Sequence, residues 1–194
     1  MQNNIYYLTQ DVVRRPASCC PKGVRKTAVD LSLSMLGFLI MYFGFCRKRG
    51  FACSVKYGTF YMLIVLMLAF TVMPFGVYTG GINRNFLETV NLIPYRDIMA
   101  HYLGAVRDTV GNILLFVPFG VALPAFFGKS TVKTVLISAA FSLTIESYQL
   151  LGVLLCFPNT RAFDITDIIN NTLGALLGAA VFSVISNRIV KRKR

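Results

Sequence analysis

The chain has 194 residues, of which 55% are hydrophobic and only 14% are charged, and its mean hydropathy is +0.61. This composition excludes an ordinary soluble domain. A membrane span needs roughly 20 mainly apolar residues, so the length suits four or five spans without a sizeable soluble module. The formal net charge of +12 lies in clusters beside apolar runs, which is typical of cytoplasmic flanks of membrane spans and argues against a nucleic-acid partner.

The first apolar run, at residues 28–46, is the hardest to place. No apolar core precedes it, so no ordinary cleavable signal peptide is expected. Basic residues flank the run on both sides, within 14–26 and 47–56, so a full crossing conflicts with the positive-inside bias. The run could instead lie at the interface or re-enter the membrane. Because it is mostly non-amphipathic, we predict an additional N-terminal span.

The remainder of the chain contains four longer apolar runs and one polar connection, at 80–108. The apolar runs are 57–79, 109–127, 132–156 and 165–187. Their lengths predict four core transmembrane helices, so the fold class is all-α, a polytopic membrane helical bundle. The basic residues place the C-terminus in the cytoplasm and the polar connection outside.

This pattern divides the chain into three regions. Residues 1–56 form a basic N-terminal region with the first membrane helix, 57–187 a membrane domain, and 188–194 a basic cytoplasmic tail. The cysteines are odd in number and show no C-x-x-C spacing, so neither a disulfide framework nor a zinc site is predicted. They are Cys19, Cys20, Cys46, Cys53 and Cys156.

The last apolar run carries an unusual polar stripe. Asp164, Asp167, Asn171, Gly174 and Gly178 are spaced three, four, three and four residues apart, which places them on one side of a helix. Polar and ionisable groups are costly in hydrocarbon and need a partner or a water-filled cavity. The stripe therefore suggests a function as well as packing.

Two other runs and one loop direct polar residues to the same outer region. Asn112 lies near the start of the run 109–127, and Arg161 stands one turn before Asp164, within reach of a carboxylate–guanidinium pair. One face of the run 132–156 carries Ser138, Ser142, Glu146 and Gln149. Together these residues predict a polar cavity open to the outer leaflet.

Each of these features also has a purely structural explanation. Arg161 and Asp164 can form a pair that fixes a helix start, with Asp164 or Thr166 as the cap. The two glycines form a G-x-x-x-G pattern, which favours close helix packing. For Glu146, a binding role and a buried structural network are equal alternatives.

The acids allow several kinds of chemistry. Glu146, Asp164 and Asp167 are hard oxygen ligands suited to Mg²⁺ or Ca²⁺, and two acids can also serve as general acid and base. The single histidine, His101, lies in a loop, and no G-x-S-x-G, H-E-x-x-H or phosphate-loop motif is present. The polar residues of the predicted cavity are suited to binding anions and amides, and none of them is an evident nucleophile. We therefore predict no catalytic residue, metal or other cofactor.

Four motifs, in order along residues 57–187, resemble the VanZ-like membrane proteins. They are Asn91-Leu-Ile-Pro94-Tyr95, Asn112-Ile-Leu-Leu-Phe-Val-Pro118-Phe-Gly120, Glu146-Ser-Tyr-Gln149, and the segment from Arg161 through Asp164, Asp167 and Asn171 to Gly174. In the first of them Tyr95 stands where phenylalanine is common. The resemblance implies a bacterial integral membrane protein, and the family's namesake is associated with teicoplanin resistance.

The polar positions of the family carry over to this chain, and we predict that they form a ligand-binding site. The polar positions that carry over are Asn91, Asn112, Glu146, Gln149, Arg161, Asp164, Asp167 and Asn171. We therefore expect a multi-pass protein of the bacterial cytoplasmic membrane that binds a lipid-linked envelope precursor or a lipoglycopeptide and contributes to teicoplanin resistance, with membrane lipids as its other partners.

Three alternatives remain at the level of the sequence. The chain could be a membrane enzyme acting on a phospholipid or polyprenyl phosphate, with the acids as general acid and base or as magnesium ligands. It could be a small-solute or proton-linked transporter, although no inverted repeat is present. It could also be a scaffold for partner helices.

Overall fold

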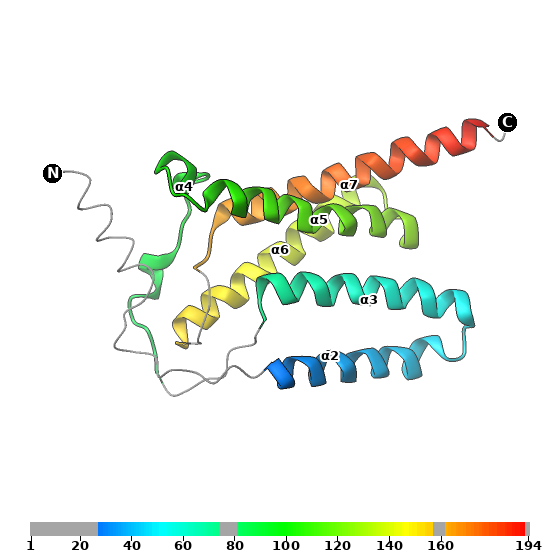
Figure 1. The fold of residues 1–194 in the computed structure, drawn as a ribbon, viewed down its shortest axis with the longest axis horizontal. Coiled ribbons are helices and arrows are strands. Elements are labelled where there is room, and N and C mark those ends of the chain that lie inside the picture. Colours follow the sequence, from blue (N-terminus) through cyan, green and yellow to red (C-terminus); the bar gives the residue numbers. More distant parts are fainter. Residues whose placement is uncertain (1–26, 74–80, 157–161, 193–194) are drawn as a thin grey trace.

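The computed structural model describes residues 27–73, 81–156 and 162–192, and it is mostly helical (Figure 1). The long helices are α2 (Thr27–Met41), α3 (Phe51–Thr71), α5 (Ala105–Phe127), α6 (Thr131–Leu154) and α7 (Ile165–Arg192). A π-helical turn, η1 (Tyr42–Cys46), extends α2. The connection between α3 and α5 holds the 3-10 helix η2 (Phe86–Thr89) and the short helix α4 (Arg96–Met99).

Four helices are long and apolar enough to cross a membrane, which confirms the prediction of an all-α bundle with four core spans. The spanning segments are Phe51–Thr71, Ala105–Phe127, Thr131–Leu154 and Ile165–Ile189.

The first apolar run is helical, but its apolar part, Ser32–Gly44, is shorter than these four. This helix, α2, lies beside α3 (Figure 1). The Tyr61 hydroxyl on α3 donates a hydrogen bond to the Ser34 carbonyl on α2 at 2.6 Å, which holds the two helices together. The full crossing of this helix stays a prediction.

Several helix ends differ from the expected ones. Helix α3 begins at Phe51 rather than 57, because Gly50, with a φ of 87°, makes the turn from η1 and the following residues are compatible with a helix. Helix α5 begins at Ala105, four residues before the expected start. Helix α7 continues to Arg192 through most of the expected tail, where basic residues are favourable at the negative end of the helix dipole.

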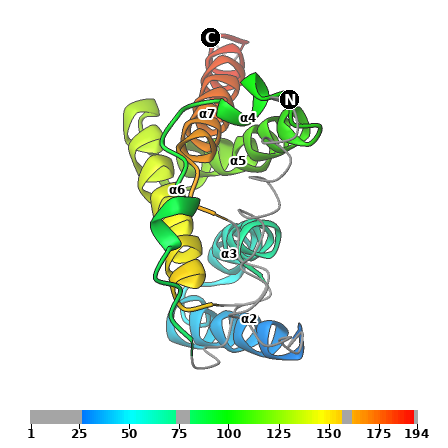
Figure 2. The same cartoon turned by 90° about the vertical axis from the view of Figure 1, so that its left-hand side faces the viewer.

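Helices α5, α6 and α7 form the central unit, in which α7 lies between the other two (Figure 2). A Cβ atom added to Gly174 would overlap the carbonyl oxygen of Ile113, and one added to Gly178 would overlap that of Val117. The close packing expected from the G-x-x-x-G pattern is thus confirmed, and α5 is the partner helix. This backbone proximity fixes the register of the polar residues at the beginning of α7.

The apolar core joins this unit to α3. Its fully buried members are Met67 from α3, Phe116, Phe119 and Leu123 from α5, Ile145 from α6 and Ala175 from α7. The ring of Phe119 stacks on Phe60 and Phe141, with centroids 5.6 and 5.4 Å apart. Only 6% of the residues in the α3 span are buried, against 33% in each of the other spans, so α3 is a peripheral helix that is less enclosed than the other three.

The charges separate the molecule into two ends. At the polar end α2, α5 and α7 begin and α3 and α6 end, and at the basic end the opposite termini meet (Figure 1). Within the described residues every acid belongs to the polar end. These acids are Asp30, Glu88, Asp97, Asp108, Glu146, Asp164 and Asp167. This asymmetry agrees with the positive-inside bias.

Candidate functional site

The site begins where the connection between α3 and α5 crosses the polar end. The Asn83 amide donates to the Leu154 carbonyl at the end of α6, at 2.8 Å. Farther along, the Asn91 amide donates to the Phe163 carbonyl at 2.8 Å, and the Ile165 amide donates to the Asn91 carbonyl at 3.0 Å. These two bonds form an isolated parallel bridge between Asn91 and Asp164. The connection is therefore held directly against the first turn of α7.

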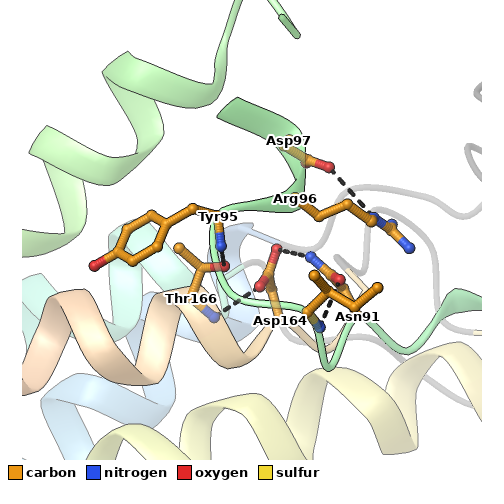
Figure 3. A network of polar contacts seen from close by, with 7 residues as sticks. Asn91, Tyr95, Arg96, Asp97, Asp164 and Thr166 are labelled. Carbon is orange, nitrogen blue, oxygen red and sulfur yellow. Dashed lines mark hydrogen bonds and ion pairs between the residues drawn. The ribbon is translucent and has the colours of Figure 1, made fainter. Parts of the chain in front are cut away.

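Asp164 is the cap of α7. Its Oδ1 accepts a hydrogen bond from the Thr166 amide at 2.7 Å, which satisfies one of the free N–H groups of the first turn. Its Oδ2 accepts from the Asn91 side-chain amide at 2.9 Å (Figure 3). Of the two caps considered from the sequence, Asp164 is the correct one. The Thr166 hydroxyl instead accepts from the Tyr95 amide at 3.0 Å.

Glu146 joins α6 to this junction. Only 1% of its surface is exposed, and its Oε2 accepts a hydrogen bond from the Asp164 amide at 3.0 Å. The two acids that the sequence expected to meet are therefore neighbours. A buried carboxylate requires hydrogen-bond donors, and the backbone N–H of Asp164, immediately before α7, is one of them.

The polar stripe of α7 reaches two different helices. The Asn112 side-chain amide on α5 donates to Asp167 Oδ1 at 2.5 Å. The Asn171 side-chain amide donates to the Ser142 hydroxyl on α6 at 2.8 Å. The stripe therefore runs along the line where α5, α6 and α7 meet, with the glycines continuing it toward the basic end.

Gln149 takes a different direction from Glu146. Its side-chain amide donates to the Thr71 carbonyl at the end of α3, at 2.9 Å, so it links α6 to the peripheral helix. Its Oε1 is buried and has no hydrogen-bond partner among the described residues, and the same holds for Asn170 Nδ2 and Asn171 Oδ1. A buried polar atom of this kind costs about 1–3 kcal/mol, so each favours an additional partner such as water or a ligand.

Sequence reasoning did not identify the pair formed by Tyr95 and Asn170. The Tyr95 hydroxyl donates to Asn170 Oδ1 at 3.3 Å, and Asn170 is 1% exposed. Tyr95 has a left-handed backbone, with a φ of 56°, which turns the connection so that its ring lies over α7. The sequence offered one indication of this pair, which is Asn170 itself. It is a second amide side chain beside Asn171, and it lies three residues after Asp167 on the same helix.

The predicted pairing of Arg161 with Asp164 lies outside the described residues and stays a prediction. At the solvent side of the junction, Arg96 Nε lies 3.8 Å from Asp97 Oδ1 in an exposed ion pair (Figure 3). Such an exposed pair contributes little to stability.

The described acids do not form a metal centre. Within the described part of the chain, no group of three His, Cys, Asp or Glu side chains is arranged to hold a metal ion. The magnesium or calcium site considered for Glu146, Asp164 and Asp167 is therefore not formed by these residues. Their oxygens face backbone and side-chain N–H groups instead, which is an arrangement for hydrogen bonding.

Comparison with known proteins gives one family and one related protein. The sequence model of the VanZ/LLP1 family matches residues 59–186. Protein VanZ of Enterococcus faecium is 29% identical over 108 residues, which cover 55% of this chain and 60% of the relative. The chain thus spans less than two thirds of that relative's length. No solved structure matches the chain.

Proposed function

Because this chain belongs to the VanZ/LLP1 family, we propose that it binds an amphipathic envelope molecule and contributes to glycopeptide resistance in a bacterial cytoplasmic membrane. The ligand is either a lipid-linked cell-wall precursor or a lipoglycopeptide such as teicoplanin. Family membership and the four spanning helices support a multi-pass membrane protein.

The observation that carries the proposal is the meeting of three helices and a loop at the polar end. Asn91, Asn112, Glu146 and Asp167 come from four different segments and lie around the first turns of α7. Hydrogen-bonding groups inside a membrane bundle are costly, and they commonly mark a pathway or binding site. The unpartnered amide atoms of the same region supply further hydrogen-bonding capacity.

The proposed orientation makes this end accessible to envelope molecules. The basic residues favour a cytoplasmic location for the opposite end, so the polar end faces the outer leaflet. Lipid-linked precursors and lipoglycopeptides combine an acyl or prenyl chain with a sugar or peptide head. The exposed apolar faces of the spanning helices can pack against the acyl or prenyl chain of the ligand. The oxygen atoms of the junction can accept hydrogen bonds from hydroxyl and amino groups of its head.

The proposed roles follow from these positions. Glu146 and Asn112 contact the buried end of the head group, and Asp164 and Asp167 orient it. Arg161, one turn before Asp164 in the sequence, binds a phosphate or carboxylate. Gln149, Asn171 and Asn91 complete the polar lining.

The test is the substitution Glu146→Gln in a host where the intact gene protects against teicoplanin. The amide oxygen of glutamine can still accept the hydrogen bond from the Asp164 amide, so the fold is retained while the negative charge is removed. We expect the inhibitory concentration of teicoplanin to fall to that of the host without the gene, at unchanged protein abundance in the membrane.

The matched control is Ser147→Ala, on the exposed face of the same helix, where the hydroxyl donates to the Leu143 carbonyl of its own helix. This variant should protect fully. Full protection by Glu146→Gln would contradict the proposed site.

A further inference from the structure

The basic end of the molecule carries a second feature, which the proposed function does not use. Cations from five separate segments lie there, in the turn before α3, at the start of α3, in the turn between α5 and α6, at the start of α6, and near the end of α7 (Figure 1). They are Arg47, Lys48, Arg49, Lys56, Lys129, Lys133 and Arg188. Within the described residues no acid lies at this end. The local potential therefore strongly favours an anionic partner.

Lys56 is held in a defined position between α3 and α5. Its Nζ lies 4.9 Å from the centroid of the Phe127 ring and 5.4 Å from that of Tyr57. The two rings pack edge to face, with centroids 5.6 Å apart. A cation over an aromatic face gains about 0.5–1 kcal/mol at an exposed site, so the ammonium is fixed at the boundary of the apolar span. Lys129, which is exposed, follows two residues after Phe127.

The surface beside these lysines is apolar. Phe51 is 85% exposed and Val55 is 50% exposed, and both lie on the first turns of α3 near Lys56. A partner must therefore combine a negative head with hydrocarbon. Nucleic acid and acidic peptides supply only the charge, whereas an anionic phospholipid supplies both.

We propose that the basic end binds the headgroup of an anionic phospholipid where Lys56 of α3 packs on Phe127 of α5, with Lys56 and Lys129 contacting the phosphate. The acyl chains then lie along the exposed apolar face of α3. This site is at the opposite end of the bundle from the polar junction, and it does not depend on the proposed function.

The experiment is native mass spectrometry of the full-length protein in detergent with added phosphatidylglycerol or phosphatidylcholine. Each basic residue near an anionic membrane surface is worth about a fivefold change in affinity. We expect phosphatidylglycerol to be retained in preference to phosphatidylcholine. Lys56→Gln and Lys129→Gln should each weaken its binding about fivefold. Soluble glycerol 3-phosphate should bind far more weakly than the lipid.

Arg84→Gln is the matched control, because it removes the same charge from an exposed position at the polar end. It should leave phosphatidylglycerol binding unchanged. Equal retention of the two lipids, wild-type binding by both lysine variants, or an equal loss in Arg84→Gln would overturn the proposal. Tight binding of glycerol 3-phosphate would also overturn it, since it would indicate a phosphate site rather than a lipid site.

Discussion

Both carboxylate oxygens of Asp164 accept hydrogen bonds from other groups of the protein. One oxygen caps α7 through the Thr166 amide, and the other holds the Asn91 side chain of the crossing connection. Its own backbone amide binds Glu146. This residue therefore organises the polar junction, and its effect on a ligand operates through the positions of Asn91 and Glu146.

Replacing Asp164 should accordingly change stability as well as function. Asp164→Ala removes the cap and the bond to Asn91, while Asp164→Asn keeps an oxygen for the cap, which asparagine supplies as well as aspartate. Loss of a cap costs roughly 1–2 kcal/mol, so we expect Asp164→Ala to lower the Tm by roughly 2–8 °C. Asp164→Asn should lower it less. Thermal unfolding in detergent measures both values, and equal losses would show that the cap is unimportant.

At the scale of the helix pair, α5 and α7 approach too closely for any side chain at Gly174 or Gly178. The atoms that a new Cβ would meet are backbone atoms, which cannot move aside without separating the helices. The hydrogen bond between Asn112 on α5 and Asp167 on α7, which lines the junction, depends on this spacing. Close packing and the polar site are therefore coupled.

We expect Gly174→Ala to destabilise the protein by about 1–3 kcal/mol through this overpacking, and to impair protection against teicoplanin as well. The control is Gly111→Ala on α5, where an added Cβ meets nothing within 4 Å. Because alanine favours a helix over glycine, this control should be neutral or slightly stabilising. Similar thermal stability of the two variants would mean that the helices can separate without cost.

The locations of the spans could be predicted because hydropathy is averaged over many residues. The first and last residues of each helix depend on single residues instead, and they were predicted less accurately. Helix α3 begins at Phe51 because Gly50, with its positive φ, makes the turn before it, and a hydropathy average does not report the conformation of one residue. The meeting of Glu146 and Asp164 followed from their positions on facing helices. The partner of Gln149 could not be predicted in this way. It is the backbone carbonyl of Thr71, and every residue has such an acceptor, so the residue type does not identify it.

At the scale of the whole molecule, the separation of charge gives a definite prediction of topology. In a cysteine-free background, a single cysteine at Lys129→Cys or Arg84→Cys reports the side on which each end lies. If the basic end is cytoplasmic, a membrane-impermeant maleimide should label Arg84→Cys in intact cells and Lys129→Cys only after permeabilisation. The reverse pattern would place the polar junction in the cytoplasm and exclude binding of extracellular glycopeptides there.

The bridge between Asn91 and Asp164 also constrains how the protein is made. Its partners are 73 positions apart, and α5 and α6 lie entirely between them. Because the chain leaves the ribosome in order, α5 and α6 emerge before Asp164, and Asn91 meets its bridge partner only after both of them. The junction at the polar end is consequently completed only when α7 arrives beside α5 and α6.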